Sequence, residues 1–583
     1  MNRQLTQSGS SSPTATDLGR ENLAAWEAAQ PDNYFNADRN LRRMLAFYWG
    51  QSRLQLVAPQ LYHFGRYAAT TVDAAARTAD LRHNLPQLAR FDGIGRRIED
   101  VDFHPSYHEA GRHIYGSGII SVYEEPAQNL LALTLFYISS QNGEAGHNCP
   151  VACTAGAVKA LQVVGSPFLR ETYLTRLLDP DYDTLFHAAQ FLTEVQGGSD
   201  VGANATTATP LDPQEGTWLI EGEKWFCSNV TAHVILMTAR VVDQGEGTRG
   251  LGLFLVPRYL PDGRLNHYTI NRLKEKLGTR AMASGEVLFQ GALAYQVGEV
   301  AAGFRNVMTH VINTSRLYNA VGTTGNARRA YLVAQAYATH RRAFDRAIIH
   351  FPLVQDLLAK MRADTMAMLS GSLRIAYLLD QEALGRAEAE DAGFLRMALN
   401  LNKFRSAVLA HEVILAAIEL LGGNGAIESF SVLPRLLRDN VVYENWEGTH
   451  NVLLAQVQRD MRRYKVHEPF LRKLRHLFNG AAALTELRLQ GLEAVEQMAA
   501  EVEQVLGMDE LTAGIYMRPL MTRLTDLYYT ACLAAEADWE LREKQDRLKQ
   551  RVALFFFSRR VLGREPKDIP YYDDMVARLA AER

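Results

Sequence analysis

The spacing of apolar residues changes twice along the chain. From about Asp17 to Leu178 the apolar positions mostly follow a helical spacing, and the residues from Leu130 to Ile138 are apolar enough to lie inside a helical domain. From about Asp181 to Val300, short apolar runs such as Leu253–Val256 alternate with turn residues, which predicts a small all-β domain of hairpins. From about Gly303 the helical spacing returns and continues along the rest of the chain.

This order predicts a mainly α protein with a central β domain. Because the strands stand together and do not alternate with helices, a doubly wound sheet and a barrel of alternating units are both disfavoured. We expect a Ser/Thr-rich disordered tail at 1–16, an N-terminal helical domain at 17–180, a middle β domain at 181–300, a helical bundle at 301–463 and a C-terminal helical extension at 464–583.

Composition removes several classes of function. With 62 Lys+Arg against 65 Asp+Glu the formal net charge is -3, so a chain-wide field that attracts polyanions is not expected. Four cysteines in 583 residues cannot form a disulfide framework, and reduced thiols in a cytoplasmic compartment are the expectation. No run of about 18 uninterrupted apolar residues occurs, so no transmembrane helix is predicted.

Two segments resemble known binding motifs but are not predicted to bind ligands. Gly245–Gly250 fits the G-x-G-x-x-G dinucleotide pattern, but the apolar run behind it predicts a strand where that fingerprint needs a helix, so we predict a hairpin loop. His147, Cys149 and Cys153 lie close together without the paired spacing typical of metal ligands, so packing roles are favoured and no metal site is predicted. No G-x-S-x-G elbow or P-loop is present, which disfavours serine hydrolases and P-loop NTPases.

Four segments in the β region and the second helical region form a specific set. They are Phe191–Val201, Lys224–Asn229, Lys276–Arg280, and Pro434–Asp439 leading into Trp446–Thr449. Each is weak alone, but in this order and at these separations they resemble the acyl-CoA dehydrogenase family.

Three further segments narrow the resemblance. Arg90–Asp92, Gly95–Arg97 and Val101–Pro105 are similar to the branch typified by the bacterial alkylation-response flavoprotein AidB, so the resemblance covers about residues 90–460. It implies an N-terminal helical domain, a barrel-like β domain and a helical bundle. The C-terminal helical extension also suits this branch.

The resemblance implies a site for FAD. The residues that it implies for the cofactor are Leu192, Thr193, Ser199, Phe226, Ser228, Arg341, Phe344, Gly422, Gly423, Trp446, Thr449 and Asn451. Phe226 and Ser228 occupy the positions that pack on and hydrogen-bond the isoalloxazine. Arg341 stands in an R-x-x-F motif whose Arg reaches the cofactor pyrophosphate across a subunit interface, a task that suits the planar guanidinium fork; Arg342 is a second candidate.

The resemblance also implies where the substrate and the base lie. Ser199 and Arg316 match positions near the acyl-CoA ligand, and Glu447 stands directly before Gly448–Thr449 as the base. Ser315 occupies the place where some members carry their base instead, which leaves Glu447 as the candidate. A free Glu has a pKa near 4.3, and burial against an apolar chain and a ring would raise it toward a useful value.

The leading hypothesis is an FAD-dependent acyl-CoA dehydrogenase in which Glu447 takes the α-proton and the β-hydride passes to the flavin, giving a 2-enoyl-CoA. The resemblance implies an electron-transfer flavoprotein as reoxidant and a homotetramer. The alternative is an AidB-like flavoprotein with little turnover that sequesters acyl-CoA or protects nucleic acid. Arg463–Arg583 carries about equal numbers of basic and acidic residues, so DNA binding by the extension is disfavoured.

Overall fold

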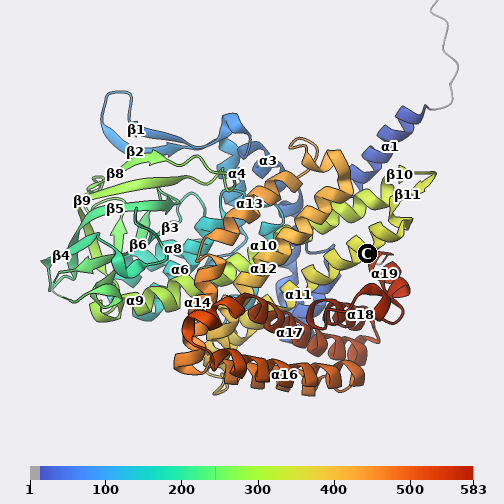
Figure 1. Ribbon diagram of the computed structural model, residues 1–583. Helices are drawn as coiled ribbons and strands as arrows, with labels where there is room; N and C mark the ends of the chain where they lie inside the picture. Colours follow the sequence, from blue (N-terminus) through green and yellow to red (C-terminus); the bar gives the residue numbers. More distant parts are fainter. Residues whose placement is uncertain (1–13, 243, 582–583) are drawn as a thin grey trace, which may run out of the picture.

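The computed structural model describes residues 14–242 and 244–581 (Figure 1). The sheet lies at one end of the molecule, the N-terminal and bundle helices lie beside it, and the C-terminal helices run along one edge (Figure 1). The predicted fold class is confirmed. The predicted tail is too long: Thr14 caps α1 (Ala15–Ala28) and forms a reciprocal capping box with Asp17, whereas residues 1–13 lie outside the described part.

The N-terminal region is built from helices. They are α2 (Arg39–Tyr67), α3 (Asp73–Ala79), α4 (Pro105–Gly116), α5 (Asn129–Ser140), α6 (Asn148–Val164), α7 (Pro167–Leu169) and α8 (Thr175–Leu177). Every residue of α5 is buried, as its apolar stretch predicts.

One hairpin interrupts this region, which we expected to be mostly helical. β1 (Gln87–Phe91) and β2 (Arg97–Asp102) are antiparallel, and both are too short to stand out from the surrounding helical spacing. Arg97 Nη1 donates to the carbonyl oxygen of Tyr268 (3.0 Å), and Glu99 Oε2 accepts from the backbone N–H of Ile270 (2.8 Å). The AidB-like segments therefore attach the N-terminal region to the sheet.

The middle region is a seven-stranded sheet that closes on itself. Its strands are β3 (Ala188–Phe191), β4 (Thr207–Asp212), β5 (Thr217–Ser228), β6 (Val234–Val241), β7 (Leu251–Pro257), β8 (Tyr268–Leu273) and β9 (Ser284–Gln296). Pairing runs β6–β4–β5–β9–β7 and returns from β7 to β6, while β3 pairs with β6 and β8 with β9. Gly245–Gly250 lies in the hairpin connection between β6 and β7, as predicted.

The helical bundle follows. It comprises α9 (Gly303–Asn306), α10 (Asn313–His340), α11 (Pro352–Ala383), α12 (Asp391–Leu421), α13 (Leu433–Asn445) and α14 (His450–Tyr464), with a short hairpin of β10 (Arg342–Ala343) and β11 (Arg346–Ala347) after α10. Within the described residues, the segment Asp391–Ala426 is long and apolar enough to cross a membrane by length and composition alone. It contains the buried Lys403 and Arg405 and packs against α10, α11 and α13, as a core helix of the bundle does.

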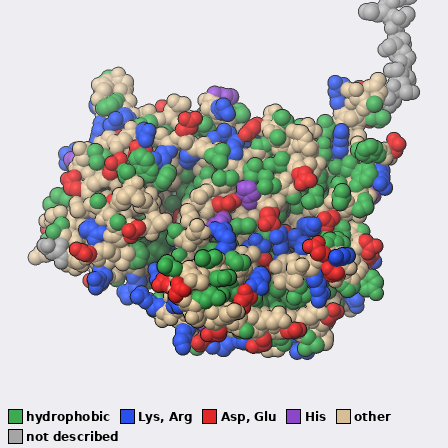
Figure 2. Space-filling model, in the orientation of Figure 1, with side chains coloured by type: hydrophobic (Ala, Val, Ile, Leu, Met, Phe, Trp, Pro, Cys, Tyr) green, Lys and Arg blue, Asp and Glu red, His purple; other side chains and the backbone are tan. Residues whose placement is uncertain are grey.

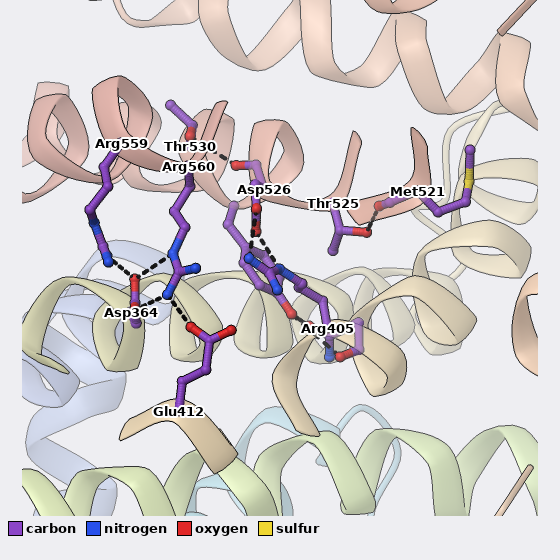
Figure 3. A network of polar contacts seen from close by, with 11 residues as sticks. Asp364, Arg405, Glu412, Met521, Thr525, Asp526, Thr530, Arg559 and Arg560 are labelled. Atoms are coloured by element: carbon purple, nitrogen blue, oxygen red, sulfur yellow. Dashed lines mark hydrogen bonds and ion pairs between the residues drawn. The ribbon is translucent and has the colours of Figure 1, made fainter. Parts of the chain in front are cut away.

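The C-terminal extension packs onto the bundle through buried ion pairs. Its helices are α15 (His467–Gly480), α16 (Thr485–Leu506), α17 (Glu510–Lys544), α18 (Leu548–Phe556) and α19 (Tyr572–Ala581). Figure 3 shows Arg405 of α12 paired with Asp526 of α17 at 2.7 Å, and Asp364 of α11 facing Arg559 and Arg560. On the face drawn in Figure 2, acidic and basic side chains are interspersed over these helices.

Candidate active site

Glu447 lies in a short turn between two helices of the bundle. α13 ends at Asn445, Trp446 is extended, and α14 begins at His450. Glu447 has φ 58° and Gly448 has φ 101°. A non-glycine residue in the left-handed region costs free energy unless its surroundings hold it there, so contacts to this turn decide where the carboxyl group points.

Two buried cations hold the main chain of this turn. Lys403 Nζ, on α12, donates to the carbonyl oxygens of Glu444 (3.0 Å) and Gly448 (2.9 Å), which stand on either side of Glu447. Arg316 Nε, on α10, donates to the carbonyl oxygen of Glu447 itself (3.0 Å). The turn is therefore held from two helices through backbone atoms, which leaves the Glu447 side chain out of these bonds.

The Glu447 carboxyl group is partly buried, and no hydrogen bond or ion pair to it occurs among the described residues. Burial raises its pKa to about 7, although the positive charges of Arg316 and Lys403 oppose the shift. Burial also lowers the pKa of Lys403 to about 7. A carboxyl group with a pKa near neutrality and no partner has the properties of a general base.

The first two motif segments lie side by side in the β region. Lys224 Nζ pairs with Glu194 Oε1 (2.7 Å) inside the protein, and the backbone N–H of Trp225 donates to the carbonyl oxygen of Thr193 (2.9 Å). Ser228 Oγ lies 3.1 Å from Ser284 Oγ. The segments that contain Leu192–Thr193 and Phe226–Ser228 thus lie side by side, and Ser228 reaches the start of β9.

The other two motif segments join the β region to the bundle. Asp439 of α13 accepts hydrogen bonds from the backbone N–H groups of Thr279 (2.6 Å) and Glu144 (2.9 Å). A side chain at Gly278 would collide with the backbone of Arg438 and Asp439, so only glycine permits this approach. These contacts hold the β region against α13, which leads directly to Glu447.

The remaining cofactor residues of the sequence prediction form a second group at the other end of α10. Arg341 follows α10, and the exposed Phe344 lies in the turn of the β10–β11 hairpin. Gly422 and Gly423 follow α12, and their neighbour Asn424 contacts Tyr337 near the end of α10. Because Arg316 and Arg341 are about 25 residues apart, the helical rise separates them by roughly 38 Å. Figure 1 shows the hairpin far from the sheet.

Three residues of the sequence prediction, Ser199, Thr449 and Asn451, lie on the surface, and their hydrogen bonding differs. Ser199 and Thr449 are exposed, and Thr449 precedes α14 without a side-chain capping bond. Asn451 Oδ1 accepts a hydrogen bond from Arg518 Nη2 of α17 (2.8 Å), so the extension reaches a position that the resemblance implies for the cofactor. The roles of these three residues stay predictions.

Several features of β5 and of the turn that carries Glu447 fit a flat cofactor with polar edges. Phe226 is 56% exposed, although Cys227, the next residue of the strand, is buried. The Trp446 Nε1–H is buried and has no hydrogen-bond partner among the described residues, an arrangement that costs about 1–3 kcal/mol unless a ligand accepts the bond. An exposed aromatic face, a donor without a partner and a hydroxyl at Ser228 together suit an isoalloxazine ring.

Sequence reasoning missed the residues that support the site. Lys224 and Lys403 are fully buried cations; Lys224 was quoted only as the start of a motif segment, and Lys403 lies within the apolar helix α12. For Lys403, a charged residue in an apolar stretch was the available signal, because buried lysines require a partner. Their partners, a side chain in another segment and two carbonyl groups, could not be read from the sequence.

Comparisons with known proteins agree with this arrangement. Residues 26–184 match the adaptive response protein AidB N-terminal domain, residues 189–292 the acyl-CoA dehydrogenase middle domain and residues 301–462 the acyl-CoA dehydrogenase C-terminal domain. Acyl-CoA dehydrogenase family member 11 of Caenorhabditis elegans is 32% identical over 484 residues, which is 80% of this chain and 76% of the relative. AidB of Escherichia coli (strain K12) is 33% identical over 391 residues, 64% of this chain and 69% of the relative.

A solved structure extends the likeness over the whole chain. The crystal structure of Caenorhabditis elegans ACDH-11 in complex with C11-CoA superposes with a TM-score of 0.82 at 26% identity, covering 100% of this chain and 95% of that one. The family resemblance drawn from the motif segments is confirmed. The chain belongs to the acyl-CoA dehydrogenase family and carries an AidB-type N-terminal domain.

Proposed function

We propose that this protein is an FAD-dependent acyl-CoA dehydrogenase that converts an acyl-CoA thioester to its 2-enoyl-CoA. The observation that carries the proposal is the Glu447 carboxyl group, whose main chain is fixed by Arg316 and Lys403 while its side chain has no partner among the described residues. Family membership makes a CH–CH oxidoreductase the expected class.

The residues present fit FAD as the cofactor. Leu192, Thr193, Phe226 and Ser228 would hold the isoalloxazine from the β region, with Trp446 beside Glu447. When bound, FAD supplies a two-electron acceptor for the β-hydride. The protein's part is to place the thioester between that face of the β region and the turn that holds Glu447.

Glu447 removes the α-proton. A pKa near 7 makes the carboxylate a stronger base than a free Glu while leaving much of it charged at neutral pH. The charges of Arg316 and Lys403 favour the carboxylate form, so they limit how far burial raises the pKa. The bonds that these cations make to backbone carbonyls keep the base in place as it gains the proton.

Two copies of the chain would complete each cofactor site. Arg341 lies roughly 38 Å along α10 from Arg316, and Phe344, Gly422 and Gly423 lie near the same end of α10. One cofactor would then take its ring contacts from one subunit and its pyrophosphate contacts from another, and we propose a homotetramer as the assembly. The 89% exposed Phe344 ring supports such an interface.

The proposed partners follow from the reaction. An acyl-CoA is the substrate, supported by the C11-CoA in the complex of the ACDH-11 structure, and an electron-transfer flavoprotein is the reoxidant, in the cytoplasm. The alternative function, a flavoprotein that binds acyl-CoA with little turnover, would use the same residues. The interspersed charges of the extension do not favour nucleic acid (Figure 2).

Anaerobic bleaching of the flavin by acyl-CoAs of graded chain length tests the proposal. We expect the purified protein to contain about one FAD per chain and to bleach with at least one member of the series. Acyl-CoA binding that perturbs the flavin spectrum without bleaching, for every chain length, would favour the binding function. An extracted cofactor other than FAD would contradict both.

A further inference from the structure

The third motif segment, Lys276–Arg280, reaches the second, Lys224–Asn229, through one buried serine. Ser228 at the end of β5 pairs with Ser284 at the start of β9 in the antiparallel register, and their hydroxyl oxygens lie 3.1 Å apart. Lys276 Nζ donates to Ser284 Oγ (3.1 Å) and to the carbonyl oxygen of Met282 (2.6 Å). An ammonium group and two hydroxyl groups therefore form one chain of contacts.

The charge of Lys276 is not neutralised by a close partner. Among residues 14–242 and 244–581, no carboxylate lies within ion-pair distance of its ammonium group, whereas Lys274, two residues earlier, pairs with Glu286 at 2.7 Å. Burial lowers the pKa of Lys276 to about 8, so the charged form predominates at pH 7. Three acidic groups favour that form without a hydrogen bond to Lys276: Cys149, Glu144 and Asp439.

The ammonium group sets the direction of the hydrogen bonds. An ammonium only donates, so Ser284 Oγ accepts from Lys276 and its single hydrogen points away from the charge. Two acceptors are within reach of that hydrogen, Ser228 Oγ at 3.1 Å and the Met282 sulfur at 3.6 Å. The sulfur is the weaker acceptor and already receives the backbone N–H of Asn229 (3.3 Å). The Ser228 hydrogen is then free to point out of the chain towards a ligand.

A donor directed outwards from a positive charge suits a group that becomes negative. The inference rests on the proposed function, in which Ser228 contacts the isoalloxazine of FAD. Hydride transfer adds H⁻ to the ring, which therefore gains one negative charge. Donors and charges that are fixed in advance stabilise such a charge without reorganisation, and charges near the ring are one means by which a protein tunes a flavin.

We propose that Lys276 raises the reduction potential of the bound flavin, acting through Ser284 and Ser228 as a positioning residue of the site. A purely structural role would be confined to the bond with the Met282 carbonyl, which closes the loop between the third motif segment and β9. Substitution separates the two roles, because the amide of Lys276→Gln can still donate hydrogen bonds but carries no charge.

The midpoint potential of the FAD-containing protein, measured anaerobically against a reference dye and without acyl-CoA, tests the proposal. Lys276→Gln and Lys276→Met should each lower the equilibrium constant for flavin reduction about tenfold, the size of effect that one nearby charge has, or about 30 mV towards negative potential. Ser284→Ala keeps the charge but removes the link, so the constant should fall about threefold, or about 14 mV. Lys465→Met, which removes an exposed lysine between α14 and α15, is the matched control and should keep the wild-type potential.

A wild-type potential in Lys276→Gln, or in Ser284→Ala, would overturn the proposal. If neither lysine variant retains FAD, Ser284→Ala decides, because it removes a single oxygen atom. Loss of FAD from all three variants would show that the segment supports the fold or the cofactor pocket alone, and would also overturn the proposal.

The measurement needs no substrate, so its outcome is independent of the proposed reaction. Bleaching by an acyl-CoA together with unchanged potentials in the variants would overturn this inference alone. Shifted potentials in a protein that no acyl-CoA bleaches would overturn the proposed dehydrogenation and leave the role of Lys276 standing.

Discussion

Two regions of this molecule bury carboxyl groups next to cations, and they do so in opposite ways. At the interface with the extension, Asp526 receives two bonds from Arg405 (2.7 and 2.8 Å), and Asp364 faces both Arg559 and Arg560 (Figure 3). At Glu447 the cations bind backbone carbonyl oxygens instead, and the carboxyl group stays without a partner among the described residues.

The difference separates a structural carboxylate from a reactive one. Burial alone would raise the pKa of Asp364, but Arg559 and Arg560 bring it below the usual value, so this carboxylate stays charged and serves to attach the extension. At Glu447 burial outweighs the cations and raises the pKa. Burial also raises the pKa of Asp526, but Arg405 binds both of its oxygens. The side-chain pairing therefore makes the difference: it occupies a carboxylate, whereas support through the main chain leaves the Glu447 carboxyl group available for proton transfer.

The largest effect is expected from Glu447→Gln. The amide keeps the size of the side chain but cannot accept the proton, so the bleaching rate should fall by at least about 10²–10⁴-fold. The loss should appear in kcat, with acyl-CoA binding retained as a perturbed flavin spectrum. Glu412→Gln, which alters an exposed partner of Arg560, is the matched control and should bleach normally. Unchanged bleaching by Glu447→Gln would place the base elsewhere.

Asp364→Asn should have the opposite effect to Glu447→Gln. The free energy of unfolding should fall, while the bleaching rate of the folded protein should not change. The change leaves Arg559 and Arg560 buried without this counter-charge, which typically costs about 3–5 kcal/mol. Urea unfolding measures the loss. The exposed pair of Asp574 with Arg578 provides the control, because Asp574→Asn should cost far less stability than Asp364→Asn. If Asp364→Asn and Asp574→Asn lowered the free energy of unfolding equally, Asp364 would not be a structural carboxylate of the kind described.

Lys403→Met tests support through the main chain. The buried carbonyl groups of Glu444 and Gly448 lose their donor, and a small displacement of the base can lower kcat by up to about 10²-fold. Removal of the positive charge should also raise the pKa of Glu447, so the acid limb of the pH–rate profile moves to higher pH. A lower kcat with an unmoved limb would mean that Lys403 contributes packing alone. Lys403→Arg keeps the positive charge, so the acid limb of its pH–rate profile should lie between those of Lys403→Met and the wild type.

The smallest effects are expected from pH itself. Because Glu447 must be a carboxylate to act as the base, kcat/KM should rise with pH through about 7. Its pKa in the folded protein lies above the ordinary 4.5, so its contribution to stability is present below about 4.5 and is lost as pH rises through about 7. Glu447→Gln should therefore be more thermostable than wild type at pH 8 but not at pH 4.5. A constant difference across this range would argue against a raised pKa.

The sequence by itself determined the family, the order of helical and β regions and the candidate base. Apolar spacing is a property of short stretches of sequence, and each motif segment is recognised by its own consecutive residues. Both can therefore be identified without coordinates. The short hairpin of β1 and β2 was not predicted, because its strands are too short to show a clear alternating pattern. Pairing between the two strands and contacts to β8 stabilise it instead.

Only the tertiary structure decided how the site works. Lys403 and Gly448 are 45 residues apart, and Arg316 and Glu447 are 131 apart, yet their bonds fix the base. The same packing divided the predicted cofactor residues between the two ends of α10. A carboxylate's reactivity depends on which groups reach it and which do not, and that is settled by how helices pack, because neighbours distant in sequence provide the desolvation, the charges and the hydrogen bonds.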